Sequence, residues 1–113
     1  MSIAMNLYYT RIGDNARKFA EEMESSGTAN LIRKEAGNIR YEYFLPISQP
    51  ETVLLIDIWV NQEAIDRHHA SPMMKTILDL REKYHLTVKA ERYITDKNGI
   101  PKEDFNFIKK QER

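Results

Sequence analysis

The 113-residue sequence contains no cysteine, which excludes disulfide bonds, thiolate chemistry and zinc or iron–sulfur sites built on cysteine. It also carries no net charge, because 17 Lys and Arg residues balance 17 Asp and Glu residues. A nucleic-acid-binding protein usually has a basic excess, so we expect no nucleic-acid partner. Little electrostatic repulsion keeps copies of a near-neutral chain apart, which favours self-association.

Long apolar runs are missing as well. No stretch approaches the roughly 20 apolar residues of a membrane-spanning helix. The N-terminal segment "MSIAMNLYYT" lacks the basic start and apolar centre of a signal peptide. We therefore expect a cytoplasmic protein with no membrane partner. The sequence also has no glycine-rich phosphate loop, nucleophile elbow or dinucleotide-binding fingerprint, and hence no visible site for a flavin or nicotinamide.

Short strands and helices alternate along a chain whose length fits one domain. β-branched and aromatic residues, alternating or in apolar runs, predict four strands, at 3–12, 38–47, 52–60 and 85–94. Apolar residues recurring every three or four positions predict helices from Asn15 to about Ala36, over 62–70, and from Pro72 to about Tyr84. Gly27 would cost the first helix up to about 1 kcal/mol relative to alanine, so a break at residues 25–28 is the alternative.

The resulting β-α-β-β-α-β order is typical of a ferredoxin-like α+β fold, in which helices cover one face of an antiparallel sheet. We assign residues 1–95 to this domain and residues 96–113 to a charged C-terminal tail. The strand at 52–60 is apolar on both faces, and a chain of this length has no second layer with which to cover it. We therefore expect a homodimer in which two sheets face each other and the tail packs on the partner subunit.

The segment 57–74, "DIWVNQEAIDRHHASPMM", contains the only tryptophan and two adjacent histidines. Consecutive helical residues point about 100° apart, and no histidine lies four residues away, so His68 and His69 should not share a metal ion. A helical wheel puts His68 in the middle of the apolar side and His69 at its border. His68 is then a core histidine, which the residues alone favour, or a catalytic base. Trp59 is likewise a core residue or the wall of an aromatic pocket.

One carboxylate stands inside an apolar strand. Asp57 lies in "LLIDIW", on the same strand face as Trp59. A carboxylate buried there must be paired or protonated. Arg40 would lie on the neighbouring strand of a hairpin, so we expect a structural ion pair between Arg40 and Asp57.

Three segments, "GNIRYEYF", "VLLIDIWVNQEAIDRHHASPMM" and "LTVKAERY", resemble the antibiotic biosynthesis monooxygenase family, which includes quinol monooxygenases. The resemblance extends over residues 5–94. It is strongest where a tryptophan is followed by a helix, a histidine nine residues on, and a serine. In this sequence these are Trp59, Glu63, Ala64, His68 and Ser71.

The resemblance implies a dimeric α/β barrel that oxidises a small phenolic or quinol-like substrate with molecular oxygen. It also implies that no metal, flavin or haem cofactor is needed. Such chemistry is possible when the deprotonated substrate itself donates an electron to oxygen, and the protein supplies desolvation, orientation and a proton acceptor. By this resemblance His68 is the catalytic base or orienting group. The substrate-binding candidates are Trp59, Asn6, Tyr8, Met73 and Ile77.

Two other functions stay open. One is isomerisation of a small carbonyl compound in the same pocket, without oxygen; the other is non-catalytic binding of a small ligand by a dimer. Haem degradation is disfavoured, because the haem-degrading relatives have a tryptophan at the position of His68 and a histidine at that of Leu78.

Overall fold

A four-stranded antiparallel sheet with strand order β2-β3-β1-β4 organises the computed structural model, which describes residues 1–109. The strands are β1 (Ile3–Thr10), β2 (Asn38–Phe44), β3 (Thr52–Trp59) and β4 (Thr87–Ile94). β2 and β3 pair as the predicted hairpin, and β1 lies between β3 and β4. The predicted ferredoxin-like fold is confirmed, with the two edge positions taken by β2 and β4.

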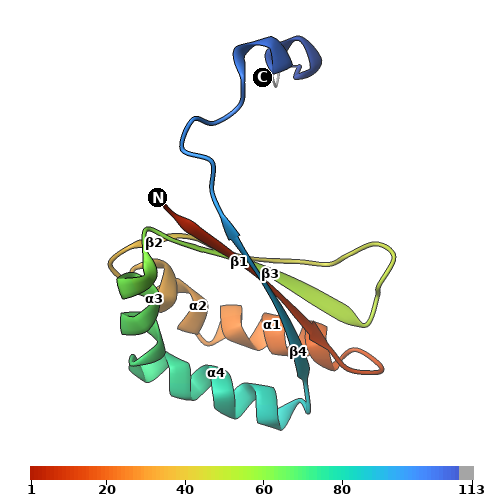
Figure 1. Ribbon diagram of the computed structural model, residues 1–113. Coiled ribbons are helices and arrows are strands. Elements are labelled where there is room, and N and C mark those ends of the chain that lie inside the picture. The colour runs from red at the N-terminus through yellow and green to blue at the C-terminus, as the bar shows by residue number, and fades with distance from the viewer. Residues whose placement is uncertain (110–113) are drawn as a thin grey trace.

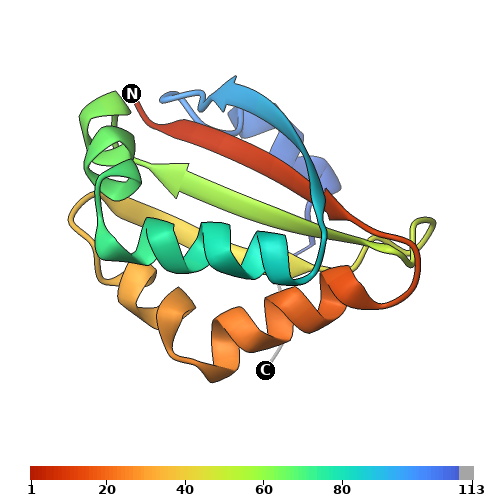
Figure 2. The same ribbon diagram turned by 90° about the horizontal axis from the view of Figure 1, so that it is seen from below.

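All four α-helices lie on one face of the sheet (Figure 1). They are α1 (Asn15–Ser25), α2 (Thr28–Arg33), α3 (Gln62–His69) and α4 (Pro72–Lys83). Figure 2, seen from the helix side, shows α1 and α4 running along the sheet and α3 standing at one end of it. None of the helices within residues 1–109 is long and apolar enough to cross a membrane.

The predicted long helix at 15–36 is two helices, so the alternative break at residues 25–28 is confirmed. Gly27 has a φ of 82°, a left-handed conformation that glycine adopts without steric cost. The change of direction also alters which residues of α2 face inward. Ala29 and Ile32 are buried, whereas Leu31, predicted to continue the apolar face of α1, is 54% exposed.

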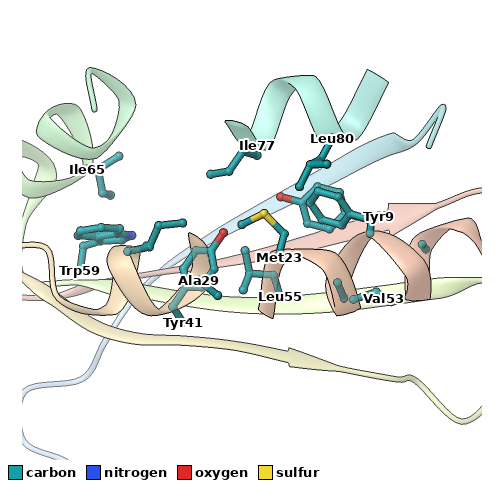
Figure 3. Close-up of a cluster of buried hydrophobic side chains, with 14 of the residues drawn as sticks. Tyr9, Met23, Ala29, Tyr41, Val53, Leu55, Trp59, Ile65, Ile77 and Leu80 are labelled. Carbon is teal, nitrogen blue, oxygen red and sulfur yellow. The ribbon is translucent and has the colours of Figure 1, made fainter. Parts of the chain in front are cut away.

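The core lies between the sheet and the helices. Along β3, every second side chain from Val53 to Trp59 faces the helices and is buried. Figure 3 shows Trp59 on the sheet facing Ile65 of α3, Tyr41 beside Ala29 of α2, and Ile77 of α4 and the other core side chains further along. This alternation explains why the strand reads as almost entirely apolar: one set of side chains fills the core, and the other faces outward.

The sheet face away from the helices, called the open face below, carries the outward set of β3. These are Leu54, Ile56 and Ile58, all only half-buried. On the same side of the sheet a C-terminal arm (residues 96–109) leaves the end of β4 and carries a 3₁₀ helix, η1 (Lys102–Phe107) (Figure 1). Hydrogen bonds of the arm join residues within the arm itself. Phe107 is 88% exposed.

Candidate functional site

A cavity of about 300 Å³ opens between the helix side of the sheet and helices α3 and α4. Its polar and aromatic lining comprises Asp57 and Trp59 of β3, Gln62, His68 and His69 of α3, Arg81 of α4 and Arg92 of β4. Apolar side chains of β1, β4 and α4 complete the walls, namely Met5, Leu7, Val88, Ala90 and Met74. The cavity therefore combines an apolar interior with a few polar groups, as small-molecule sites usually do.

Helix α3 positions the histidine. The Asn61 side chain caps the helix by accepting a hydrogen bond of 2.9 Å from the backbone N–H of Ala64. At the other end the Ser71 hydroxyl donates to the carbonyl of His68 at 2.6 Å. His68 is 5% exposed and faces the sheet, while His69 is exposed. The predicted orientation of the two histidines is confirmed.

His68 contacts an aromatic ring and a carboxylate. Its ring stacks on Trp59 with the centroids 4.8 Å apart and an interplanar angle of 28°. Its Nδ1 lies 2.8 Å from Oε2 of Glu35. An ionised carboxylate only accepts hydrogen bonds, so this contact favours the tautomer with hydrogen on Nδ1 and leaves Nε2 as the proton acceptor.

Burial lowers the pKa of the His68 imidazole from its ordinary value, although the nearby Glu35 carboxylate opposes this. The ring is consequently neutral near pH 7, with a basic nitrogen available. A neutral, oriented imidazole at the wall of a cavity can act as a general base.

The sequence interpretation did not include Glu35, and Gly37 explains how it reaches the histidine. Gly37 has a φ of 89°, and an added Cβ would lie 2.6 Å from Cβ of Ala64 and 2.9 Å from Cγ2 of Val60. Only glycine lets the chain pass this close to α3. The close approach brings Glu35, 33 residues away in sequence, into contact with His68.

Asp57 is buried, at 6% exposure, and its Oδ1 has no hydrogen-bond partner among residues 1–109. The predicted ion pair with Arg40 is wrong. Arg40 lies opposite Ile58 rather than Asp57, so its side chain is on the open face, where it pairs with Glu42 at 2.7 Å. Burial, aided by the Glu35 carboxylate and opposed by the Trp59 side chain, raises the pKa of Asp57 to about 7. A buried carboxylate must be either paired or protonated. With a pKa of about 7 and no ion pair to a described residue, Asp57 is partly protonated at neutral pH.

Arg81, like Arg92, is a charged residue of the cavity lining that the sequence interpretation did not include. One Nη2–H donates to the Tyr9 hydroxyl at 3.0 Å, and the guanidinium carbon lies 5.2 Å from the centroid of that ring. Its Nε is buried without a hydrogen-bond partner. Within residues 1–109 no carboxylate oxygen lies within 4.0 Å of this guanidinium.

The remaining predicted binding residues do not gather around His68. Ile77 belongs to the buried core and Met73 packs against that core, but the methionine of α4 that lines the cavity is Met74. Asn6 and Tyr8 lie on the open face of the sheet, away from the helices. The Tyr8 hydroxyl there donates to Glu91 at 2.9 Å.

Two other observations concern alternative sites. Within the described chain, residues 1–109, no three His, Cys, Asp or Glu side chains come together in a way that could hold a metal ion. A larger hollow of about 680 Å³ lies between α1 and the edge strand β2. Its charged side chains, Arg17, Glu21 and Glu24, are exposed to solvent. We therefore place the candidate site at the cavity beside His68.

Fold and cavity together define a ferredoxin-like α+β protein with an internal site between its sheet and its helices. Residues 1–80 match the family described as antibiotic biosynthesis monooxygenase, and the chain belongs to this family. The matched region includes His68, Trp59 and most of α4. The resemblance drawn from the sequence segments is thereby confirmed.

Solved structures of other proteins share the fold at low sequence identity. A candidate antibiotic biosynthesis monooxygenase from Deinococcus radiodurans is 22% identical, with a TM-score of 0.70 over 86% of this chain and 94% of that one. SnoaB, a cofactor-independent oxygenase from Streptomyces nogalater solved in a mutant form, is 16% identical, with a TM-score of 0.66 over 89% and 98%. A conserved protein of unknown function from Bacteroides thetaiotaomicron, described as a possible oxidoreductase, is 18% identical, with a TM-score of 0.71 over 81% and 95%. No curated protein sequence matches the chain.

Proposed function

We propose that this protein is a cofactor-independent monooxygenase that oxidises a small phenolic or quinol-like compound with molecular oxygen in the cavity beside His68. The observation that carries the proposal is the imidazole of His68 held between Trp59 and Glu35 at the cavity wall. Family membership and the printed description of SnoaB as a cofactor-independent oxygenase agree with it.

The proposed reaction begins with proton transfer. Nε2 of His68 takes the hydroxyl proton of the substrate, and Glu35 stabilises the imidazolium that forms. The apolar walls raise the energy of the resulting phenolate by removing water, which favours transfer of one electron to oxygen. The substrate radical and superoxide then combine at a ring carbon to give a peroxide, which takes the proton back from His68. Loss of water, with the hydrogen of that carbon, leaves a quinone that contains one atom of the oxygen molecule.

The same proposal includes a homodimer. The half-buried residues Leu54, Ile56 and Ile58 form an apolar strip on the open face, where a second copy of the sheet would bury them. The arm leaves the domain on this side, with Phe105 and Phe107 exposed (Figure 1). A partner seated on the open face would meet the arm, so we assign the arm to contacts with the second subunit.

Oxygen uptake with a panel of quinols tests the activity, and His68→Ala should reduce turnover at least tenfold if the imidazole is the base. The matched control is Glu63→Ala, which removes an exposed side chain of the same helix outside the cavity lining and should leave the rate unchanged. Turnover under strict anaerobiosis would instead support isomerisation of a carbonyl compound. Saturable binding without any turnover would support a non-catalytic ligand-binding dimer.

A further inference from the structure

The cavity contains a positive charge that the protein does not neutralise. The guanidinium of Arg81 lines the cavity, and no carboxylate of residues 1–109 lies within salt-bridge distance of it. A second arginine of the lining, Arg92 of β4, donates to the Gln62 side chain at 2.7 Å and also has no carboxylate of residues 1–109 within salt-bridge distance. Charges withdrawn from water are normally paired, so a partly buried guanidinium without a carboxylate partner in a cavity indicates a negative ligand.

The contacts that Arg81 does make leave most of its N–H groups without an acceptor in the described part of the chain. The Tyr9 hydroxyl uses one Nη2–H, and the Tyr9 ring lies beside the guanidinium. The buried Nε–H has no acceptor. Arginine binds both oxygens of a carboxylate through two N–H groups of one planar edge, whereas a neutral phenol accepts only one such bond.

Asp57 does not neutralise the positive charge of the cavity. Its carboxyl also lines the cavity, but it makes no ion pair with Arg81, and its Oδ1 has no partner. Burial favours the neutral form of this carboxyl. Even with Asp57 ionised, the two guanidinium groups of Arg81 and Arg92 give the cavity lining a net positive charge.

The volume limits what can enter. About 300 Å³ is at the lower end of the range for small-molecule pockets, which suits a compound of one or two rings. The apolar walls of β1 and β4 and the Trp59 ring suit an aromatic body.

We propose that the substrate is a small hydroxyaromatic carboxylate, whose carboxylate binds the guanidinium edge of Arg81 while its hydroxyl lies beside His68. This inference rests on the proposed monooxygenase function for the role of the hydroxyl, and on the geometry of Arg81 for the carboxylate. In this proposal the substrate carries a permanent negative charge on its carboxylate, in addition to the phenolate charge that forms only during the reaction.

Three probes separate these sources of negative charge: 2,5-dihydroxybenzoate, its neutral analogue 2,5-dihydroxybenzamide, and hydroquinone. Calorimetric binding should favour the acid over the amide by roughly tenfold to a hundredfold, as for a hydrogen-bonded charged pair. Arg81→Met should remove that preference and leave the affinity for hydroquinone unchanged. Arg81→Lys, which keeps the charge but not the planar edge, should retain part of it.

The matched control is Lys75→Met, which removes an exposed cation from the same helix and should not alter the preference. Equal binding of acid and amide by the unmodified protein would overturn the inference, and so would a preference that survives in Arg81→Met. An Arg81-dependent preference without oxygen uptake would overturn the monooxygenase function and leave the carboxylate site standing. Oxygen uptake at equal efficiency with hydroquinone and the acid would overturn the carboxylate site and leave the monooxygenase function standing.

Discussion

Replacing Gly37 with alanine should destabilise the fold and disturb His68 in the same step. An alanine at this φ of 89° is strained whatever surrounds it, at a cost of roughly 1–2 kcal/mol. Its Cβ would also meet Cβ of Ala64 at 2.6 Å and Cγ2 of Val60 at 2.9 Å. Overpacking of this kind costs roughly 1–3 kcal/mol, which gives a total of about 2–5 kcal/mol. That is a large part of the roughly 5–15 kcal/mol typical of a domain.

Gly13 provides a matched control for the backbone contribution. Its φ is 91°, almost the same as that of Gly37, but an added Cβ there would have nothing within 4 Å. Gly13→Ala should therefore show the conformational cost alone, roughly 1–2 kcal/mol. The difference between the two variants measures the contact between Gly37 and helix α3.

Urea unfolding followed by far-UV circular dichroism gives both free energies, and the double variant Gly37→Ala/Ala64→Gly tests the assignment of the clash. Removing the Ala64 methyl should recover part of the loss, so that the two changes are non-additive. The His68 pKa, followed by NMR, should fall in Gly37→Ala because Glu35 is displaced. Equal losses in Gly37→Ala and Gly13→Ala, with additive behaviour in the double variant, would refute the reasoning.

The site and the arm lead to three further predictions. Glu35→Gln should lower the pKa of His68, because the carboxylate that favours the imidazolium is gone; an unchanged NMR titration would contradict this. Asp57 binds its proton more tightly in the folded state, with a pKa raised from 3.8 to about 7, so its contribution to stability is complete below about pH 4 and is lost as the pH rises through 7. Three pKa units correspond to about 4 kcal/mol at most, and urea unfolding of Asp57→Asn at several pH values should show this slope removed relative to the unmodified protein. Deleting residues 96–113 should weaken the dimer more than tenfold in sedimentation equilibrium, and an unchanged dissociation constant would contradict the role assigned to the arm.

The fold could be predicted from the sequence because its signals are local. Alternating apolar residues in the strands and apolar residues every three or four positions in the helices depend on near neighbours, and the predicted strands and helices appear as expected in type. The break at Gly27 was recognisable as an alternative for the same reason. The inward direction of His68 follows from helical periodicity alone.

The charged part of the site could not be predicted, because it depends on register and on approach between distant segments. A one-residue difference in pairing places Arg40 on the other face from Asp57, and no strand pattern determines that register by itself. Glu35 and Arg81 look like ordinary surface residues at helix ends. Only the passage of the chain at Gly37 and the packing of α4 bring them to the cavity.

The stacking of Trp59 on His68 gives the protein an internal optical probe. Trp59 is the only tryptophan of the chain, so all indole emission originates at the wall of the cavity. A protonated imidazole accepts an electron from an excited indole, and the emission intensity should therefore follow the charge on His68 as the pH changes. The arrival of an aromatic ligand would change the same signal, so occupancy and proton transfer can both be followed in the unlabelled protein.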